Sequence, residues 1–286
     1  MPSVQGFSTQ RARSYIFRLP LFTRVIIVII LGFWAAGVQS VWDLRQWGAL
    51  IPSEVNLATG KSLPSGDGHG PKKKNTDDLV AAHRLTSFPL IHLNLFHALV
   101  NIVALTPLME RFESEYGTLT TLALFFGPLT SIPAVLYLII ERFILRADNT
   151  VMGASIWVFL LLGMEAIRTF KSNPYLVLGT HHIPTWTTPL LLIFVVAVMM
   201  PGTSLLGHLC GLAVGYVAGL GCIKYLAPPE WALRWAESRL NLLGRLPHYV
   251  SIDQKTYGRF GVLPTNNRAG GSAATELVGS TQRLGP

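Results

Sequence analysis

The sequence has few charged residues and few cysteines. Only 13% of its 286 residues are Asp, Glu, Lys or Arg, whereas about a quarter is usual in a soluble domain. Its two cysteines, Cys210 and Cys222, lie in one apolar run, so they form neither a disulfide framework nor a metal-binding spacing. Because 50% of the residues are hydrophobic, the composition indicates a chain that has a lipid bilayer as its main solvent.

The formal net charge is +8, and a basic chain can bind nucleic acid. Here, however, the Lys and Arg residues lie in the termini and in the loops between apolar runs. That distribution is typical of membrane topology and not of a phosphate-binding face. We therefore expect no nucleic-acid partner.

Six apolar runs approach the length of about 20 residues that a membrane-spanning helix needs. They predict an all-α fold, a polytopic bundle of six transmembrane helices. The first run follows Arg11, Arg13 and Arg18 and is longer than the apolar part of a signal peptide, so we expect it to stay as a signal anchor. The six runs lie near 21–42, 93–112, 118–141, 152–169, 187–201 and 203–227.

Three regions are expected along the chain: a cytosolic segment 1–20, a membrane domain 21–227 and a cytosolic tail 228–286. Six spans place both termini on one side, and the Lys and Arg residues near both termini predict that this side is the cytosol. The lumenal loop at about 43–91 is predicted to be flexible, because its middle is rich in Gly, Ser, Pro and Lys.

The first part of the tail, residues 230–246, has Trp231 and Trp235 near one helical face, with Arg residues interspersed. Tryptophan and arginine in this pattern are typical of a helix that lies in the membrane interface. We expect such a helix here.

Polar residues gather at the start of the second run: His92, Asn94, His97 and Asn101. Such residues are costly inside a membrane and usually mark a functional site. The last three fall on one helical face. Asn and His also join helices to one another, but four such residues within ten positions favour a site.

Two further groups lie in the fourth and sixth runs. Ser155 follows Gly153 near the amino end of its run, where free backbone N–H groups can stabilise an oxyanion. His208 precedes Gly211 and Gly215, and glycines four residues apart form a smooth stripe for close helix packing. A lone serine in a membrane helix usually bonds to its own helix, and a glycine stripe can serve packing alone.

Depth connects these groups. The second, fourth and sixth runs enter the membrane from the same side, and His97, Ser155 and His208 each lie about four or five residues inside, roughly 6–8 Å deep. A neutral imidazole can take the proton of a serine hydroxyl. We expect Ser155 to be the nucleophile and His208 its base, with His97, Asn101 and the Ser155 N–H as oxyanion donors. No carboxylate lies at this depth, so the pair is predicted to be a dyad.

These motifs resemble the rhomboid family of intramembrane serine proteases. Two positions depart from the family pattern, because Ile156 follows the serine where Gly is usual and His83 stands where Trp is common. The matching positions are His92, His97 and Asn101 in the second run, Gly153 and Ser155 in the fourth, His208, Gly211 and Gly215 in the sixth, and Arg84, Glu110 and Gly117 outside them.

The resemblance implies hydrolysis of a peptide bond in or near a transmembrane segment of another membrane protein, with no metal and no organic cofactor. The alternative is an inactive rhomboid-like protein that binds membrane clients without cleaving them. Inactive relatives often lose the serine or the histidine, whereas this chain keeps Ser155 and His208.

The six-span form with a long basic tail most resembles fungal Golgi rhomboids, which implies a multi-pass protein of the Golgi membrane. Within the tail, Tyr257–Pro264 loosely resembles short motifs that bind AAA ATPases of the Cdc48 type. The expected partners are thus membrane-protein substrates, the lipid bilayer and an ATPase of this type.

Overall fold

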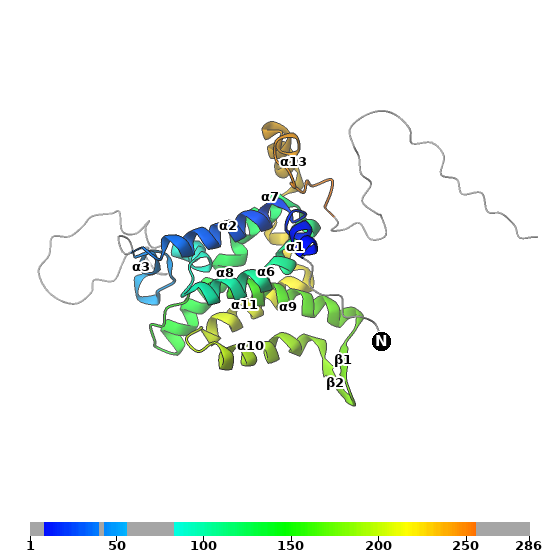
Figure 1. Ribbon diagram of the computed structural model, residues 1–286. Coiled ribbons are helices and arrows are strands. Elements are labelled where there is room, and N and C mark those ends of the chain that lie inside the picture. The colour runs from blue at the N-terminus through cyan, green and yellow to red at the C-terminus, as the bar shows by residue number, and fades with distance from the viewer. Residues whose placement is uncertain (1–8, 40–42, 56–82, 256–286) are drawn as a thin grey trace, which may run out of the picture.

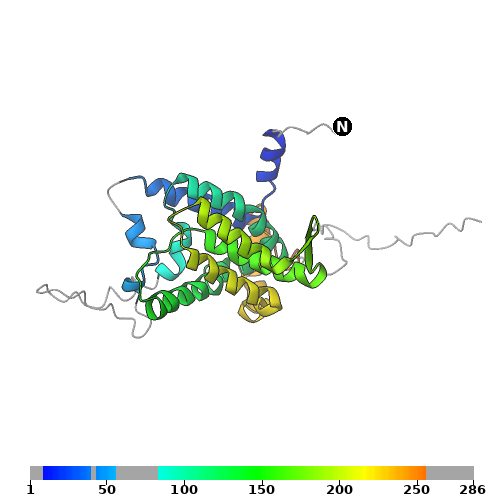
Figure 2. The ribbon, with the colours of Figure 1, turned by 90° about the horizontal axis from the view of Figure 1, so that it is seen from below.

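The computed structural model describes residues 9–39, 43–55 and 83–255. The tail motif at Tyr257–Pro264 and most of the loop that was predicted to be flexible lie outside these residues. The described chain is a bundle of helices that run side by side, as two perpendicular views show (Figures 1 and 2).

The elements follow one another along the described chain, with 3-10 and π segments labelled η. In chain order they are α1 Thr9–Ile16, α2 Leu21–Ala36, α3 Leu44–Gly48, η1 Pro52–Glu54, α5 Arg84–Ser87, η2 Phe88–Leu90, α6 Leu95–Tyr116, α7 Thr118–Phe125, α8 Pro128–Ile139, η3 Ile140–Ile144, α9 Ser155–Ser172, β1 Tyr175–Leu178, β2 His181–Pro184, η4 Thr185–Thr187, α10 Thr188–Met199, α11 Leu205–Val217, η5 Ala218–Cys222, α12 Ile223–Leu226, α13 Glu230–Leu240 and α14 Leu242–Arg245.

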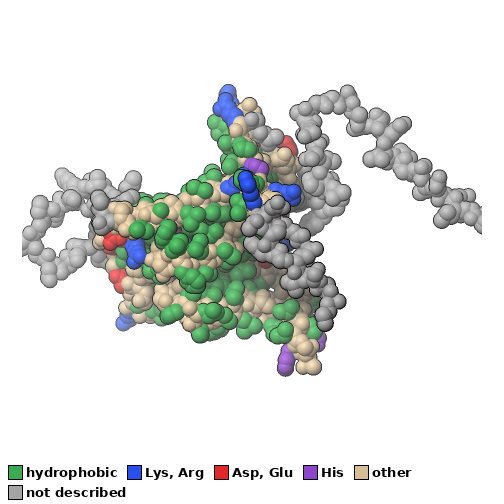
Figure 3. Space-filling view, viewed as in Figure 1, with side chains coloured by type: hydrophobic (Ala, Val, Ile, Leu, Met, Phe, Trp, Pro, Cys, Tyr) green, Lys and Arg blue, Asp and Glu red, His purple; other side chains and the backbone are tan. Residues whose placement is uncertain are grey.

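Three helical stretches in the described chain are long and apolar enough to cross a membrane: Leu95–Tyr116, Thr118–Ile144 and Leu205–Leu226. Leu21–Ala36 and Thr185–Met199 are apolar but shorter. Hydrophobic side chains cover the flank of the bundle in Figure 3. The chain is therefore a multi-pass, mainly helical membrane protein, and the number of six spans stays a prediction.

A small hairpin lies between α9 and α10 in this mostly helical chain. Strands β1 and β2 pair antiparallel, with Leu178 opposite His181. The two-residue turn between them contains Gly179, which has a φ of 62°. The apolar, partly β-branched run of β1 favours an extended chain, and glycine accepts the positive φ that the turn requires.

The two ends of the bundle differ. Helix α3 lies at one end, and α1, α13 and the hairpin lie toward the other (Figure 1). We call these the α3 end and the α13 end. At the α13 end the first residues of α2 and α7 are tied to the segment after α14, because Leu21 N donates to His248 O at 3.0 Å and Thr118 N donates to Val250 O at 2.9 Å.

Helix α9 occupies the centre of the bundle. Its residues from Ile156 to Leu161 are all buried, and it contacts α6, α8 and α11. Its one buried indole N–H, on Trp157, donates to Thr130 Oγ1 of α8 at 2.8 Å. An amino acid run that is apolar on every side predicts such a central position, since no face of the helix needs water.

A buried carboxylate joins α6 to the start of α2. Glu113 is fully buried and accepts hydrogen bonds from Phe22 N and Thr23 N at 2.8 Å each. It also accepts from the hydroxyls of Thr23 and Thr118 at 2.8 and 2.7 Å. The first N–H groups of a helix have no partner within it and carry partial positive charge. Glu113 therefore caps α2 from a neighbouring helix.

Replacing Glu113 by Ala should destabilise the fold, because it leaves two buried N–H groups and two hydroxyls without their acceptor. We expect a loss on the order of 3 kcal/mol, measured as a lower midpoint of thermal unfolding in detergent. Glu110→Gln is the matched control, since among the described residues Glu110 accepts a hydrogen bond from the Tyr15 hydroxyl at 2.5 Å, near the surface. Equal midpoints for the two variants would contradict the capping role.

Candidate active site

Side-chain caps hold the amino ends of α6 and α11 at the α3 end. Asn94 Oδ1 accepts from His97 N at 2.8 Å, and the Ser204 hydroxyl accepts from Gly207 N at 3.1 Å. Asn and Ser are favoured at this position because their oxygen satisfies a free N–H of the first turn. The caps set where His97 and His208 emerge from their helices.

Ser155 is the first residue of α9, so it lies nearer the helix end than the four or five residues expected. The preceding chain is held extended, because Leu50 and Val151 exchange backbone hydrogen bonds of 2.9 and 3.0 Å. Gly153 N then donates to Phe88 O at 2.9 Å. Because these contacts hold residues 151–153 outside the helix, α9 begins only at Ser155.

Ser155 and His208 meet across α9 and α11. The distance from Ser155 Oγ to His208 Nε2 is 2.9 Å. The His208 side chain is buried and Ser155 is half-buried. The imidazole also lies 4.6 Å from the ring of Phe159, one turn after Ser155. The opposite nitrogen, Nδ1, has no hydrogen-bond partner among the described residues.

His92 supports the loop that leads to Ser155. Its Nε2 accepts from Ala154 N at 3.2 Å, and its Nδ1 lies 3.2 Å from Leu90 O. A neutral ring with its proton on Nδ1 satisfies both contacts. His92 thereby holds the backbone amide that directly precedes Ser155.

His97 lies against the same loop. Its ring is 5.2 Å from that of His92, and neither of its buried nitrogens has a partner among the described residues. At Gly153, where φ is 114°, a Cβ would be 2.7 Å from His97 Cε1. Only glycine combines this backbone angle with this space. The result is an imidazole ring beside Gly153, two residues before Ser155, whose nitrogens have no hydrogen-bond partner among the described residues.

Asn101 is buried one turn further along α6. Its Nδ2 donates to His97 O at 2.9 Å within the same helix. The amide therefore stays on the face that carries His97, and its present partner is its own backbone.

The predicted glycine stripe lies between α11 and α9. A Cβ on Gly211 would be 2.5 Å from Ile156 O, and one on Gly215 would collide with Leu160 O. The Ile156 side chain itself is buried, with Cγ1 facing Gly211. The unusual isoleucine after Ser155 thus packs between helices.

The carboxylates of the neighbouring helices are occupied elsewhere. Glu165 pairs with Arg111 at 3.0 Å, and Arg168 pairs with Glu115 at 2.7 Å. Within the part of the chain that the structure describes, no three His, Cys, Asp or Glu side chains form a metal-binding group.

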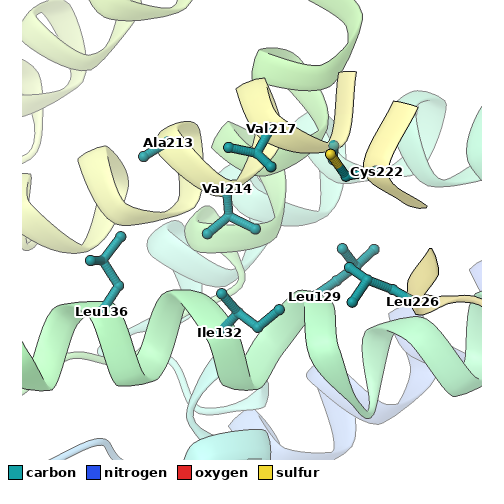
Figure 4. Close-up of a pocket in the computed structure, with 9 residues that line it drawn as sticks. Leu129, Ile132, Leu136, Ala213, Val214, Val217, Cys222 and Leu226 are labelled. Carbon is teal, nitrogen blue, oxygen red and sulfur yellow. The ribbon is translucent and has the colours of Figure 1, made fainter. Parts of the chain in front are cut away.

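A hollow of about 190 Å³ lies between α8 and the helices α11 and α12 (Figure 4). Its lining side chains are apolar and include Leu129, Ile132, Val217 and Cys222. None of them is a candidate site residue, so this groove is separate from Ser155.

A family model described as Rhomboid domain matches residues 81–225. The chain is 63% identical to Rhomboid-type serine protease 2 of Gibberella zeae, with 100% of this chain and 99% of that protein covered. It is 56% identical to the protein of the same name from Podospora anserina, with coverage of 100% and 99%. The chain belongs to the rhomboid family. As a rhomboid-type protein it is a serine endopeptidase.

The remaining rhomboid positions can be placed in the structure. Arg84 is buried, pairs with Glu54 and donates to Ala49 O at 2.8 Å, so it stabilises the chain before η2. Gly117, with a φ of 88°, forms the corner between α6 and α7. The buried carboxylate at this corner is Glu113 and not Glu110. Sequence reasoning did not find its role, nor that of Phe159.

Replacing Gly215 by Ala should separate α11 from α9, because the new methyl group meets the backbone of Leu160. We expect a destabilisation of about 1–3 kcal/mol, as for other overpacked cores, visible in thermal unfolding. Gly32→Ala in α2 is the matched control, since a Cβ there has nothing within 4 Å. That change should be neutral or stabilising. A stable Gly215→Ala protein would show that the approach of the helices is not tight.

Proposed function

We propose that this rhomboid protein is an intramembrane protease that uses Ser155 as nucleophile and His208 as general base. The observation that carries the proposal is the 2.9 Å contact between Ser155 Oγ and His208 Nε2. These side chains are 53 residues apart in sequence, and hydrogen-bond reach between a hydroxyl and an imidazole is what nucleophile activation requires.

In the proposed reaction His208 Nε2 takes the hydroxyl proton while Ser155 Oγ attacks the peptide carbonyl carbon. The proton then passes to the leaving amine, and a water molecule, activated by the same imidazole, hydrolyses the acyl-enzyme. No described carboxylate holds His208 Nδ1, so helix packing and the Phe159 ring orient the imidazole. This arrangement is a dyad.

The negative oxygen of the intermediate needs donors already in place. The N–H of Ser155 belongs to the first turn of α9, where no intrahelical partner exists. His97 adds a ring N–H without another described partner. Asn101 would contribute after its amide leaves His97 O, while His92 acts through the Ala154 amide as a positioning residue.

The proposed substrates are transmembrane or juxtamembrane segments of other membrane proteins. Ser155 and His208 lie in the first turns of α9 and α11 at the α3 end, which supports access from the lumenal side. We place both termini in the cytosol, since α1 and α13 share the other end (Figure 1). The proposed six spans are α2, α6, α7 to η3, α9, α10 and α11 to α12. Location in the Golgi membrane and binding of a Cdc48-type ATPase stay predictions.

Ser155→Ala and His208→Ala should each lower cleavage of single-span reporter substrates by more than about 10³-fold, because either change removes nucleophile activation. Cleaved product is measured on blots of cells that express protease and reporter. Ser131→Ala is the control, since among the described residues that hydroxyl donates to Gly127 O, at the start of α8.

Unchanged cleavage in Ser155→Ala would refute the dyad. A client-binding phenotype that survives both substitutions, with no cleavage of any reporter by the unmodified protein, would favour the inactive rhomboid-like alternative.

Gly153→Ala should slow cleavage by about 10²–10³-fold, the usual effect of losing one oxyanion donor, because its Cβ would displace His97. Gly202→Ala separates backbone strain from this clash: Gly202 also has a positive φ, 96°, but a Cβ there meets nothing within 4 Å. Reporter kinetics should show near-normal rates for Gly202→Ala. Equal loss in both variants would remove His97 from the proposed mechanism.

A further inference from the structure

Helix α13 presents two large aromatic side chains to its surroundings. Trp231 is 74% exposed and Trp235 is 62% exposed. They are four residues apart and share one side of the helix, while Leu233 on another side is buried. The helix predicted over 230–246 is shorter than expected, because Asn241 has a φ of 47° and ends α13 at Leu240. The exposed pair remains on one rigid element.

Helix α13 is fastened to the segment that follows α14. Glu237 Oε1 accepts from the Tyr249 hydroxyl at 2.7 Å and from Ile252 N at 3.0 Å. Arg234 pairs with Asp253 at 2.8 Å. None of these contacts uses a tryptophan side chain, and both indole rings stay largely exposed. They are therefore left for another surface.

The segment after α14, residues 246–255 and here called the fastening segment, is in turn hydrogen-bonded to the helical bundle. Leu21 N donates to His248 O, and Val250 exchanges hydrogen bonds of 2.9 Å with Thr118 through both its N and its O. Leu21 and Thr118 are the first residues of the apolar helices α2 and α7. Apolar helices begin at the membrane boundary, where Trp is enriched. The hydrogen bonds of His248 and Val250 therefore hold α13 at the membrane boundary.

Figure 3 shows which way the projecting helix is oriented. Hydrophobic side chains line the edge that faces the α3 end, and cationic side chains gather at the tip. Arg239 and Arg245 are exposed. The apolar edge is thus turned toward the layer occupied by the lipid-facing flank of the bundle.

We propose that α13 lies on the lipid leaflet at the α13 end, with Trp231 and Trp235 inserted among the headgroups and Arg239 and Arg245 beside lipid phosphates. An indole ring suits this region because it joins an apolar body to a polar N–H. The occupant of the surface is the bilayer, since the apolar edge continues the lipid-facing flank. Through His248 and Val250 the leaflet is coupled to the starts of α2 and α7.

A nitroxide label at Ser238→Cys tests this placement in the full chain reconstituted in phospholipid vesicles. Ser238 is exposed and lies three residues after Trp235, on the same side of α13. The matched label is at Asp253→Cys, on the fastening segment, where the side chain is 67% exposed. Both variants carry Cys222→Ser, because that thiol is partly exposed while Cys210 is buried.

Collisions with oxygen, which concentrates in lipid, and with a water-soluble nickel chelate are compared by electron paramagnetic resonance. We expect the label at position 238 to favour oxygen and the label at 253 to favour the chelate. Adding Trp231→Ala and Trp235→Ala should abolish the oxygen preference at 238. Equal collision frequencies with the chelate at positions 238 and 253 would overturn the proposal. So would an oxygen preference at position 238 that remains after both tryptophans are replaced.

Discussion

The close approach of α9 and α11 is the contact on which the site depends. Gly211 and Gly215 bring the backbone of α11 against the carbonyl oxygens of Ile156 and Leu160. Ser155 directly precedes this contact on one helix, and His208 lies one turn before it on the other. Because a 2.9 Å hydrogen bond tolerates little displacement, the glycine stripe sets the distance between the proposed nucleophile and base. In the proposed dyad, helix packing orients the imidazole, as a carboxylate does in a triad.

The rest of the site is built on backbone groups that lack helical partners. The amino ends of α6, α9 and α11 meet at the α3 end, and each brings free N–H groups. Asn94, Ser204 and His92 satisfy some of them. The Ser155 N–H belongs to the first turn of α9, where no intrahelical acceptor exists, and the nitrogens of the His97 ring have no hydrogen-bond partner among the described residues. Within apolar surroundings such groups are costly, so a site for a negatively charged oxygen is a consistent use of them.

The α13 end uses the same physics for stability. Glu113 satisfies the free N–H groups of α2, and Arg168 with Glu115 neutralises two charges between α9 and α6. Charges in a membrane protein are tolerated when they pair. The two ends therefore differ in these groups: Glu113 and the Arg168–Glu115 pair are partnered at the α13 end, whereas the His97 ring and His208 Nδ1 at the α3 end have no hydrogen-bond partner among the described residues.

Several features could be predicted from sequence because they are local. Apolar runs and the polar residues inside them show in the letters themselves, which is why His92, His97, Asn101, Ser155 and His208 could be named in advance. The role of Glu113 could not, since three of its hydrogen bonds come from Phe22 and Thr23, 90 or 91 residues earlier in the chain.

The sequence by itself determined that this is a membrane protein with a serine, histidines and a glycine stripe at similar depth, because hydropathy and helical spacing are properties of short segments. Only the tertiary structure decided that His208 Nε2 faces Ser155 Oγ, that Ser155 opens its helix, that Asn101 bonds to its own backbone and that Ile156 is buried. Those outcomes depend on how helices pack, and packing is set by side-chain shapes on both partners at once.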